Sequence, residues 1–139
     1  MAISLHFKRD MNFVLTRVFG EIDDLQAKEH VLKLNEVAKN EKSLNEIADC
    51  RNLKDFDKAS VQGIFSAAAL EQGQQRAIGG VLIIVVATDV IFRLARAYAI
   101  GAGDVRKEII VTKSMDEAIQ RLDYSDSDKE IIRRFIEEA

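Results

Sequence analysis

The strongest constraint on the fold is a run of seven apolar residues, Val81–Ala87, which contains no polar side chain. Gly79 and Gly80 precede the run, and Thr88 follows it. A strand with one solvated face alternates apolar and polar residues, whereas a continuous β-branched run is typical of a strand covered on both faces. The run is far shorter than the ~20 apolar residues of a membrane-spanning helix. It therefore predicts a strand buried inside an α/β domain.

Four further segments have the pattern of strands. In the first, apolar residues alternate with polar ones, and the second is rich in aromatic and β-branched residues. A turn near Asn12 joins these two segments, so they predict an antiparallel hairpin. The third is followed by an acidic and polar turn that extends to Asp57. These predicted strands comprise residues 3–7, 13–19, 44–50 and 108–112.

Apolar residues at helical spacing predict helices between and after the strands. Thr88 and Ser114 are predicted N-caps, Ser127 is the expected start of a helix in the tail, and Gly101 with Gly103 is expected to end the third helix. The predicted helices comprise residues 23–40, 58–74, 88–101, 114–122 and the tail from residue 127. The residues expected to face the core are Ala27, Val31, Leu34 and Ala38, then Val61, Ile64, Phe65 and Ala68, then Ile91, Leu94, Ala95 and Tyr98.

The resulting order, β-β-α-β-α-β-α-β-α plus a C-terminal helix, predicts a single-domain α/β fold. Strands that alternate with helices form a mostly parallel sheet, and here an antiparallel hairpin opens it. We expect residues 1–122 to form the domain and residues 123–139 to form an amphipathic helix. The apolar side of that helix is expected to pack on its own domain or on a second copy of the chain. Its apolar residues are Ile131, Ile132, Phe135 and Ile136.

Length, charge and cysteine content exclude several classes of protein. A chain of 139 residues fits one domain, and 20 basic against 23 acidic residues give a net charge of −3, without the basic bias of a nucleic-acid binder. The single cysteine excludes an internal disulfide. Cys50, His6 and His30 lack metal-ligand spacing, and no cofactor motif is present, so no metal or cofactor is expected. The first ten residues contain no signal-peptide apolar region, which predicts a cytoplasmic location.

Three segments carry a family resemblance. They are Glu46–Asp49, a strand that ends in Asp; residues 81–96, an apolar strand with a Thr-Asp cap, an aromatic residue and Leu-Ala-Arg; and residues 109–119, a late strand and helix. The chain resembles the SpoIIAA-like family, a bacterial branch of the STAS-type folds that is also grouped with CRAL-TRIO-like lipid-binding domains. The resemblance covers about residues 3–122. It implies a small cytoplasmic module, and most members of this family lack an assigned activity.

The resemblance makes Ser60 a candidate phosphoacceptor. In STAS-type anti-sigma-factor antagonists, a Ser at the start of the helix after the third strand is phosphorylated, and the added charge weakens binding to the partner kinase. Ser60 holds nearly that position in the stretch Asp57-Lys58-Ala59-Ser60, where the antagonists carry Asp-Ser-Ser-Gly. A serine is also favoured at a helix start simply as a cap, so both interpretations are open.

Asp49, Asp57, Thr88 and Asp89 are expected at the carboxyl ends of parallel strands or just beyond them. Ligands of open α/β sheets usually bind at this edge, and paired carboxylates can perform acid–base chemistry. The alternative is that these residues cap helices and close turns. The sequence places no histidine or nucleophile that would complete a mechanism, so an enzyme is the least favoured function.

Two predicted helices offer further candidate surfaces. Arg93 and Arg96 share an outer face with Phe92 beside them, a pattern typical of a partner or anion contact, or of an ordinary solvated face. The second predicted helix carries Gly63 and several alanines, which allow close helix packing or leave room for an apolar ligand. A pocket for such a ligand would lie between the second and third predicted helices.

These observations predict a non-enzymatic regulatory or protein-interaction module that forms a homodimer. Its expected working surface combines the helix start at Asp57–Ser60 with the Phe92–Arg96 face. The alternative is a carrier or sensor of a small apolar, lipid-like ligand, and an enzyme that uses strand-end carboxylates is less favoured. The expected partner is another protein, with no role for nucleic acid or a transmembrane segment.

Overall fold

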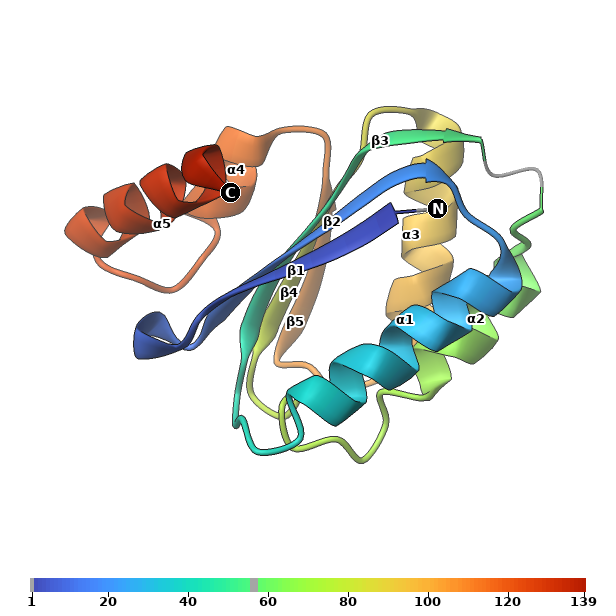
Figure 1. Cartoon of the computed structure of the whole chain (residues 1–139), viewed down its shortest axis with the longest axis horizontal. Helices are drawn as coiled ribbons and strands as arrows, with labels where there is room; N and C mark the ends of the chain where they lie inside the picture. Colours follow the sequence, from blue (N-terminus) through green and yellow to red (C-terminus); the bar gives the residue numbers. More distant parts are fainter. Residues whose placement is uncertain (1, 56–57) are drawn as a thin grey trace.

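The protein folds around a mixed β-sheet (Figure 1). In the computed structural model, which describes residues 2–55 and 58–139, the sheet has five strands that lie side by side in chain order. The first two strands are antiparallel, and each later strand is parallel to the one before it. The strands are β1 (Ala2–Lys8), β2 (Phe13–Glu21), β3 (Asn45–Asp55), β4 (Val81–Val85) and β5 (Glu108–Thr112).

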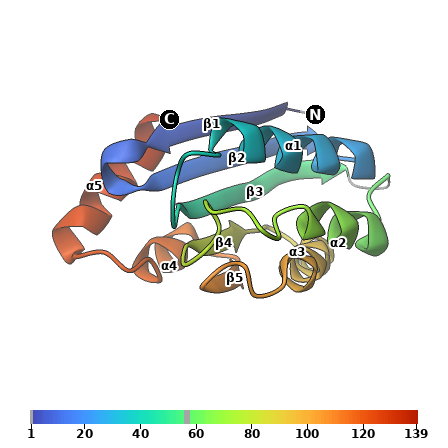
Figure 2. The same cartoon turned by 90° about the horizontal axis from the view of Figure 1, so that it is seen from below.

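Helices cover both faces of the sheet, so the fold has three layers (Figures 1 and 2). The helices that follow β2, β3 and β4 lie on one face, and the two C-terminal helices lie on the other. The order of strands and α-helices in the described residues is the predicted one. The helices are α1 (Asp24–Val37), α2 (Val61–Ala69), α3 (Asp89–Ala102), α4 (Met115–Gln120) and α5 (Asp126–Glu138), with a short 3-10 helix, η1 (Arg9–Met11), between β1 and β2.

Strand β4 is buried on both faces, as the apolar run predicts. Val81, Ile83 and Val85 pack against α4 and α5, whereas Leu82 and Ile84 pack on the side of α3. Successive side chains of a strand point to opposite faces of the sheet. A strand between two helical layers therefore needs an apolar residue at every position.

The N-terminal hairpin is confirmed, and Asn12 adopts a left-handed conformation (φ 54°) at its turn. Strand β3 differs from the prediction, because it continues to Asp55 beyond the expected end at Cys50. Its backbone keeps pairing with β2 as far as Glu21, and this pairing extends the strand. Much of the predicted acidic turn is therefore strand, while residues 56–57, including the candidate Asp57, lie outside the described residues.

The helix boundaries agree with the predicted caps in part. Thr88 caps α3, and its hydroxyl accepts a hydrogen bond from the Ile91 amide. Helix α5 begins after Ser125, not after Ser127, because the Ser125 hydroxyl accepts from the Asp128 amide. Of the two glycines expected to end α3, Gly103 has a positive φ, but Gly101 lies inside the helix.

The predicted buried side of α2 is confirmed for Ile64 and Ala68 and wrong for Val61 and Phe65. Val61 and Phe65 are 58% and 43% exposed, while Ile64, Ala67 and Ala68 are buried. Helix α2 lies between α1 and α3, which it contacts on both sides, so its small residues face its neighbours. The exposed Val61 and Phe65 are thus available to solvent.

Helix α5 packs on the sheet of its own chain. Ile132 and Ile136 are 0% and 4% exposed and join Phe13 and Leu15 of β2 in one apolar cluster. The ring of Phe135 meets that of Phe13 edge-on, with 6.1 Å between the ring centroids. The division of the chain after residue 122 stays a prediction.

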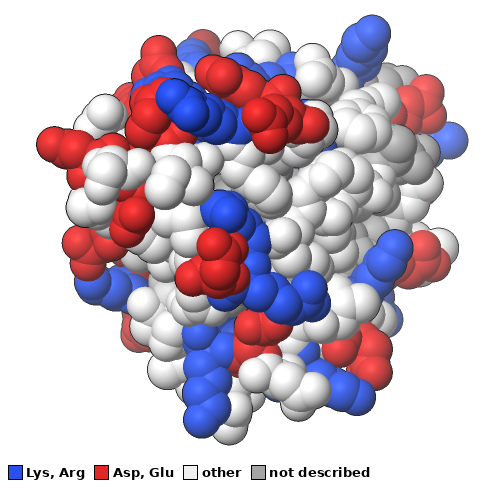
Figure 3. Space-filling model, turned by 60° about the vertical axis from the view of Figure 1, so that its left-hand side comes forward, with Lys and Arg blue, Asp and Glu red and all other residues white. Residues whose placement is uncertain are grey.

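The surface on the side of α4 and α5 carries basic and acidic side chains intermixed around an uncharged area (Figure 3). This face therefore has no continuous patch of one charge sign. Within the described residues, no helix combines the length and the apolar character needed to cross a membrane.

Candidate functional site

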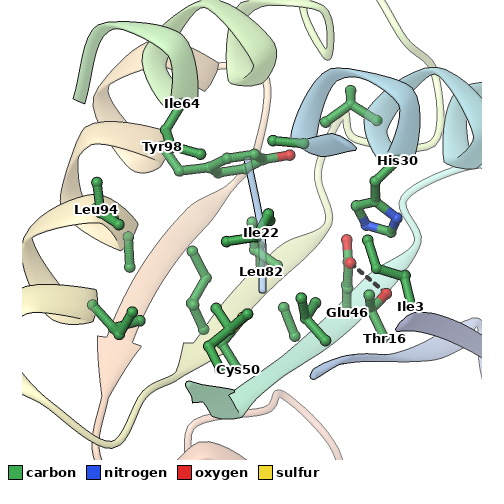
Figure 4. Close-up of a pocket in the computed structure, with 18 residues that line it drawn as sticks. Ile3, Thr16, Ile22, His30, Glu46, Cys50, Ile64, Leu82, Leu94 and Tyr98 are labelled. Carbon is green, nitrogen blue, oxygen red and sulfur yellow. Dashed lines mark hydrogen bonds between the residues drawn. The ribbon is translucent and has the colours of Figure 1, made fainter. Parts of the chain in front are cut away.

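A cavity of about 110 Å³ lies between the sheet and helices α1, α2 and α3 (Figure 4). Its lining is almost entirely apolar. The pocket was predicted between α2 and α3, and α3 does contribute four lining residues. Helix α2 contributes Ile64 alone, and the sheet and α1 provide most of the rest. The lining residues are Ile3, Thr16, Val18, Ile22, Ala27, His30, Val31, Glu46, Ala48, Cys50, Leu53, Ile64, Leu82, Ile84, Ile91, Leu94, Ala95 and Tyr98.

Strand alternation places much of this lining on one face of the sheet. In β3, Glu46, Ala48 and Cys50 all line the cavity, because side chains two residues apart share a face. Three of the lining positions carry alanine: Ala27 in α1, Ala48 in β3 and Ala95 in α3. Larger side chains at such positions would fill the space in an ordinary close-packed core.

One end of the cavity is polar. Thr16, His30, Glu46 and Tyr98 lie there, on β2, α1, β3 and α3 (Figure 4). The Thr16 hydroxyl donates a hydrogen bond of 2.8 Å to Glu46 Oε2. The His30 ring lies near Glu46, and the Tyr98 hydroxyl points toward this end (Figure 4). Neither His30 nor Tyr98 makes a hydrogen bond to another lining residue (Figure 4).

Glu46 belongs to a buried charge cluster, which comprises Glu46, Glu71, Arg76 and Arg106. All four residues are at most 4% exposed. Arg106 Nη2 donates to Glu46 Oε1 at 2.9 Å and to Glu71 Oε1 at 2.5 Å, and Arg76 Nη2 donates to Glu71 Oε1 at 3.1 Å. Two carboxylates and two guanidinium groups give the cluster no net charge.

Burial and the cluster set the charge state of the cavity. Burial alone would raise the pKa of Glu46, but the two arginines more than offset it, so its pKa lies below the usual value. Burial lowers the pKa of His30 and raises that of Tyr98, and it raises the pKa of Cys50 to about 12. These three groups are therefore uncharged at neutral pH, and Arg106 balances the charge of Glu46.

Ser60 lies at the N-cap of α2, away from the cavity. Its Oγ accepts a hydrogen bond from the Gly63 amide at 2.9 Å and donates to Asp24 Oδ2 at 2.8 Å. Its amide donates to Asp24 Oδ1 at 2.8 Å. Asp24 fills the space beside Gly63, where an added Cβ would lie 2.0 Å from Asp24 Cγ. Gly63 thus permits a close contact between α1 and α2, and it does not line the cavity. The role of Ser60 as a phosphoacceptor stays a prediction.

We expect Gly63→Ala to lower the free energy of unfolding by about 1–3 kcal/mol. The added Cβ would displace Asp24 and break its hydrogen bonds to Ser60. In an Asp24→Ala variant the Asp24 side chain no longer blocks the added Cβ. Gly63→Ala should then cost little or should stabilise the protein, because alanine favours a helix over glycine. Urea unfolding followed by circular dichroism measures both effects. An equal cost in both backgrounds would contradict this account.

Asp49 lies within β3, so its predicted place at a strand end is wrong. It is 4% exposed and faces away from the cavity, since residues 46, 48 and 50 take the cavity side. Arg51 donates to both carboxylate oxygens at 2.9 and 3.0 Å, and Arg17 Nε lies 3.8 Å from Oδ2. Burial would raise the pKa of Asp49, but the hydrogen bonds from Arg51 hold it below its usual range. The carboxylate is therefore fully engaged.

The remaining candidate residues lie at the start of α3. Thr88 is the helix cap, and the exposed Asp89 pairs with the lysine that follows β5. Phe92 is partly buried against the apolar cluster of β4 and α3, whereas Arg93 and Arg96 are exposed. Phe92 packs inward, so the outer face carries the two arginines without the predicted aromatic neighbour.

Sequence reasoning did not identify the charge cluster. The sequence could have marked Glu46 as unusual, because it shares a strand face with Ala48 and Cys50, where an apolar residue is expected. Arg76 and Arg106 lie in connecting segments, where charged side chains are normally solvated. No local pattern marks them as buried.

The fold and the cavity together define a three-layer α/β domain with an apolar pocket beneath its helices. The sequence matches no protein-family model, and a search of curated proteins also gave no match. Among solved structures, it is similar to an uncharacterized protein of the DUF3478 family from Shewanella loihica PV-4, described as having a SpoIIAA-like fold. The TM-score is 0.52 at 12% sequence identity, and the alignment covers 86% of this chain and 90% of that one. The chain therefore has a SpoIIAA-like fold, which confirms the predicted fold class.

Proposed function

We propose that this protein binds a small, mostly apolar molecule in the cavity and acts as a carrier or sensor. The observation that supports this function is an apolar cavity of about 110 Å³ inside a small domain. Protein interiors are close-packed, and voids larger than a water molecule are few. For scale, an engineered apolar cavity of ~150 Å³ binds benzene. The proposed ligand, or the part of it that enters the cavity, is therefore about the size of benzene.

The groups around the cavity favour binding over catalysis. The thiol of Cys50, with a pKa raised to about 12, is not the thiolate that nucleophilic chemistry requires. Glu46 is held by Thr16 and Arg106, and Asp49 lies on the other face of the sheet. We therefore propose a non-enzymatic role.

An NMR titration of the isotope-labelled protein with toluene tests this function. We expect saturable shift changes in the residues that line the cavity. Ala95→Leu places a larger side chain in the cavity and should weaken toluene binding by about tenfold or more. Ala99→Leu, one turn further along α3 and outside the lining, is the matched control and should bind toluene as the unmodified protein does. Binding that is absent in the unmodified protein, or lost equally in both variants, would contradict the proposal.

A second candidate function, a regulatory protein-interaction module, is favoured by the exposed start of α2. Val61 directly follows Ser60, Phe65 lies one helical turn further along, and both leave large apolar side chains in solvent. Exposed apolar groups that lie together are typical of contact surfaces. We propose a second copy of the chain as the partner. The free thiol of Cys50 is compatible with a reducing cytoplasm.

Native and denaturing mass spectrometry distinguish the two functions. Extra mass that disappears on denaturation would support the carrier or sensor. A dimer that Phe65→Ser dissociates would support the interaction module. A monomer at every concentration would contradict the proposed homodimer.

A further inference from the structure

The polar end of the cavity offers hydrogen-bonding groups without net charge. The Tyr98 hydroxyl and a neutral His30 ring can each donate and accept a hydrogen bond. Neither bonds to another lining residue (Figure 4). Glu46 is the charged group in the lining, and Arg106 balances it at 2.9 Å. No lysine or arginine is among the described residues that line the cavity.

We infer that the cavity selects an apolar molecule that carries one uncharged hydroxyl group, placed against Tyr98 and His30, over a carboxylate of the same size. The inference rests on the proposed function, because it names the ligand class of the same cavity. A hydroxyl group would give the half-buried Tyr98 and His30 a hydrogen-bonding partner inside the cavity, where no other lining residue provides one. A ligand carboxylate would lie near the Glu46 carboxylate and would find no lysine or arginine in the lining to pair with, and an unpaired buried charge is costly.

The surroundings of His30 support the uncharged state of this end. Burial is the main reason that the pKa of His30 is lowered; Arg76 and Lys33 lower it further, while Glu46 and Glu71 oppose them. A neutral ring has no positive charge with which to attract a carboxylate. The imidazole therefore acts as a hydrogen-bonding group toward a ligand.

The charge cluster behind Glu46 does not open an anion site in the cavity. Arg76 Nη1 and the Nε and Nη1 atoms of Arg106 are buried and have no hydrogen-bond partner among the described residues. Neither arginine lines the cavity. A ligand in the cavity therefore faces Glu46 and not these guanidinium groups.

Four probes of one size test the selectivity: toluene, benzyl alcohol, benzoate and benzylamine, each titrated at pH 7.5 and followed by NMR. We expect benzyl alcohol to bind about fivefold more tightly than toluene. It should bind at least about tenfold more tightly than benzoate, because benzoate brings an unpaired charge. Benzoate or benzylamine binding as tightly as benzyl alcohol would overturn the inference. Equal binding of toluene and benzyl alcohol would overturn it and leave the proposed function intact, whereas no binding of any probe would overturn both.

Tyr98→Phe removes the hydroxyl and keeps the ring. We expect this variant to bind toluene as before and to lose the preference for benzyl alcohol. Tyr124→Phe is the matched control, because the Tyr124 hydroxyl donates to the Met11 carbonyl at 2.7 Å and lies outside the lining. The control should keep the preference. A preference that persists in Tyr98→Phe would overturn the role of this hydroxyl.

Discussion

Replacing Arg106 by methionine is expected to lower the free energy of unfolding by about 3–5 kcal/mol. Arg106 bonds both carboxylates of the charge cluster, and Arg106, Glu46 and Glu71 are at most 4% exposed. Without the guanidinium group, Glu46 keeps the hydrogen bond from Thr16 but has no direct counter-charge. A buried carboxylate that loses its partner carries the full cost of its removal from water. This is the largest effect of a single substitution that we expect in this protein.

Urea unfolding at pH 7, followed by circular dichroism, measures this effect. Arg121→Met is the matched control, because Arg121 pairs with acidic groups at the surface and its side chain is 48% exposed. We expect the control to change the free energy of unfolding by at most about 1 kcal/mol. The double variant Glu46→Met with Arg106→Met leaves Glu71 paired with Arg76, so it should be less destabilised than the sum of the single variants. Equal effects of Arg106→Met and Arg121→Met would contradict the role of the cluster.

Gly101→Ala should lower the free energy of unfolding by about 1–3 kcal/mol. Gly101 lies inside α3, where this helix packs against α2. An added Cβ would lie 2.3 Å from the carbonyl oxygen of Phe65 and 3.0 Å from the Cβ of Ala68. The first obstacle is the backbone of another helix, so the two helices must separate. This cost exceeds the ~1 kcal/mol by which alanine favours a helix over glycine.

Thermal and urea unfolding of Gly101→Ala measure the cost. The comparison with Gly63→Ala shows which kind of obstacle is involved. At Gly63 the obstacle is the Asp24 side chain, and truncation of that side chain should restore stability. At Gly101, truncation of Ala68 should not restore stability, because the Phe65 carbonyl remains in place. A Gly101→Ala variant at least as stable as the unmodified protein would rule out the close approach of α2 and α3.

The order of the elements could be predicted because each element must bury an apolar face. The unbroken run at Val81 predicted β4, since a strand between two helical layers has no solvated side. Ala27, Val31 and Leu34 predicted the buried side of α1 because residues three and four apart share a helix face. The Thr88 cap could be predicted because it serves the amides of its own helix. These signals are local, and the structure confirms them.

Where the prediction was wrong, a neighbouring element decided the outcome. Strand β3 reaches Asp55 because β2 continues to pair with it as far as Glu21. Phe65 was expected in the core, but α1 and α3 flank α2, so the small side of the helix faces inward. Asp49 is engaged by Arg51 inside the longer strand instead of standing at an edge.

Local pattern was enough to predict the α/β class, the order of the strands and helices, and the cap of α3, because these depend on residues within a few positions of one another. The position of the cavity and the charge that it presents depend instead on contacts between elements that are far apart in the chain. Glu46 lies in β3, Glu71 and Arg76 lie in the connection between α2 and β4, and Arg106 lies just before β5, so the four residues meet only when these three segments are assembled. Charged residues are solvated unless a partner comes within a few ångströms, and such a partner can be far away in the chain. Local pattern therefore predicted the scaffold, and long-range packing created the site.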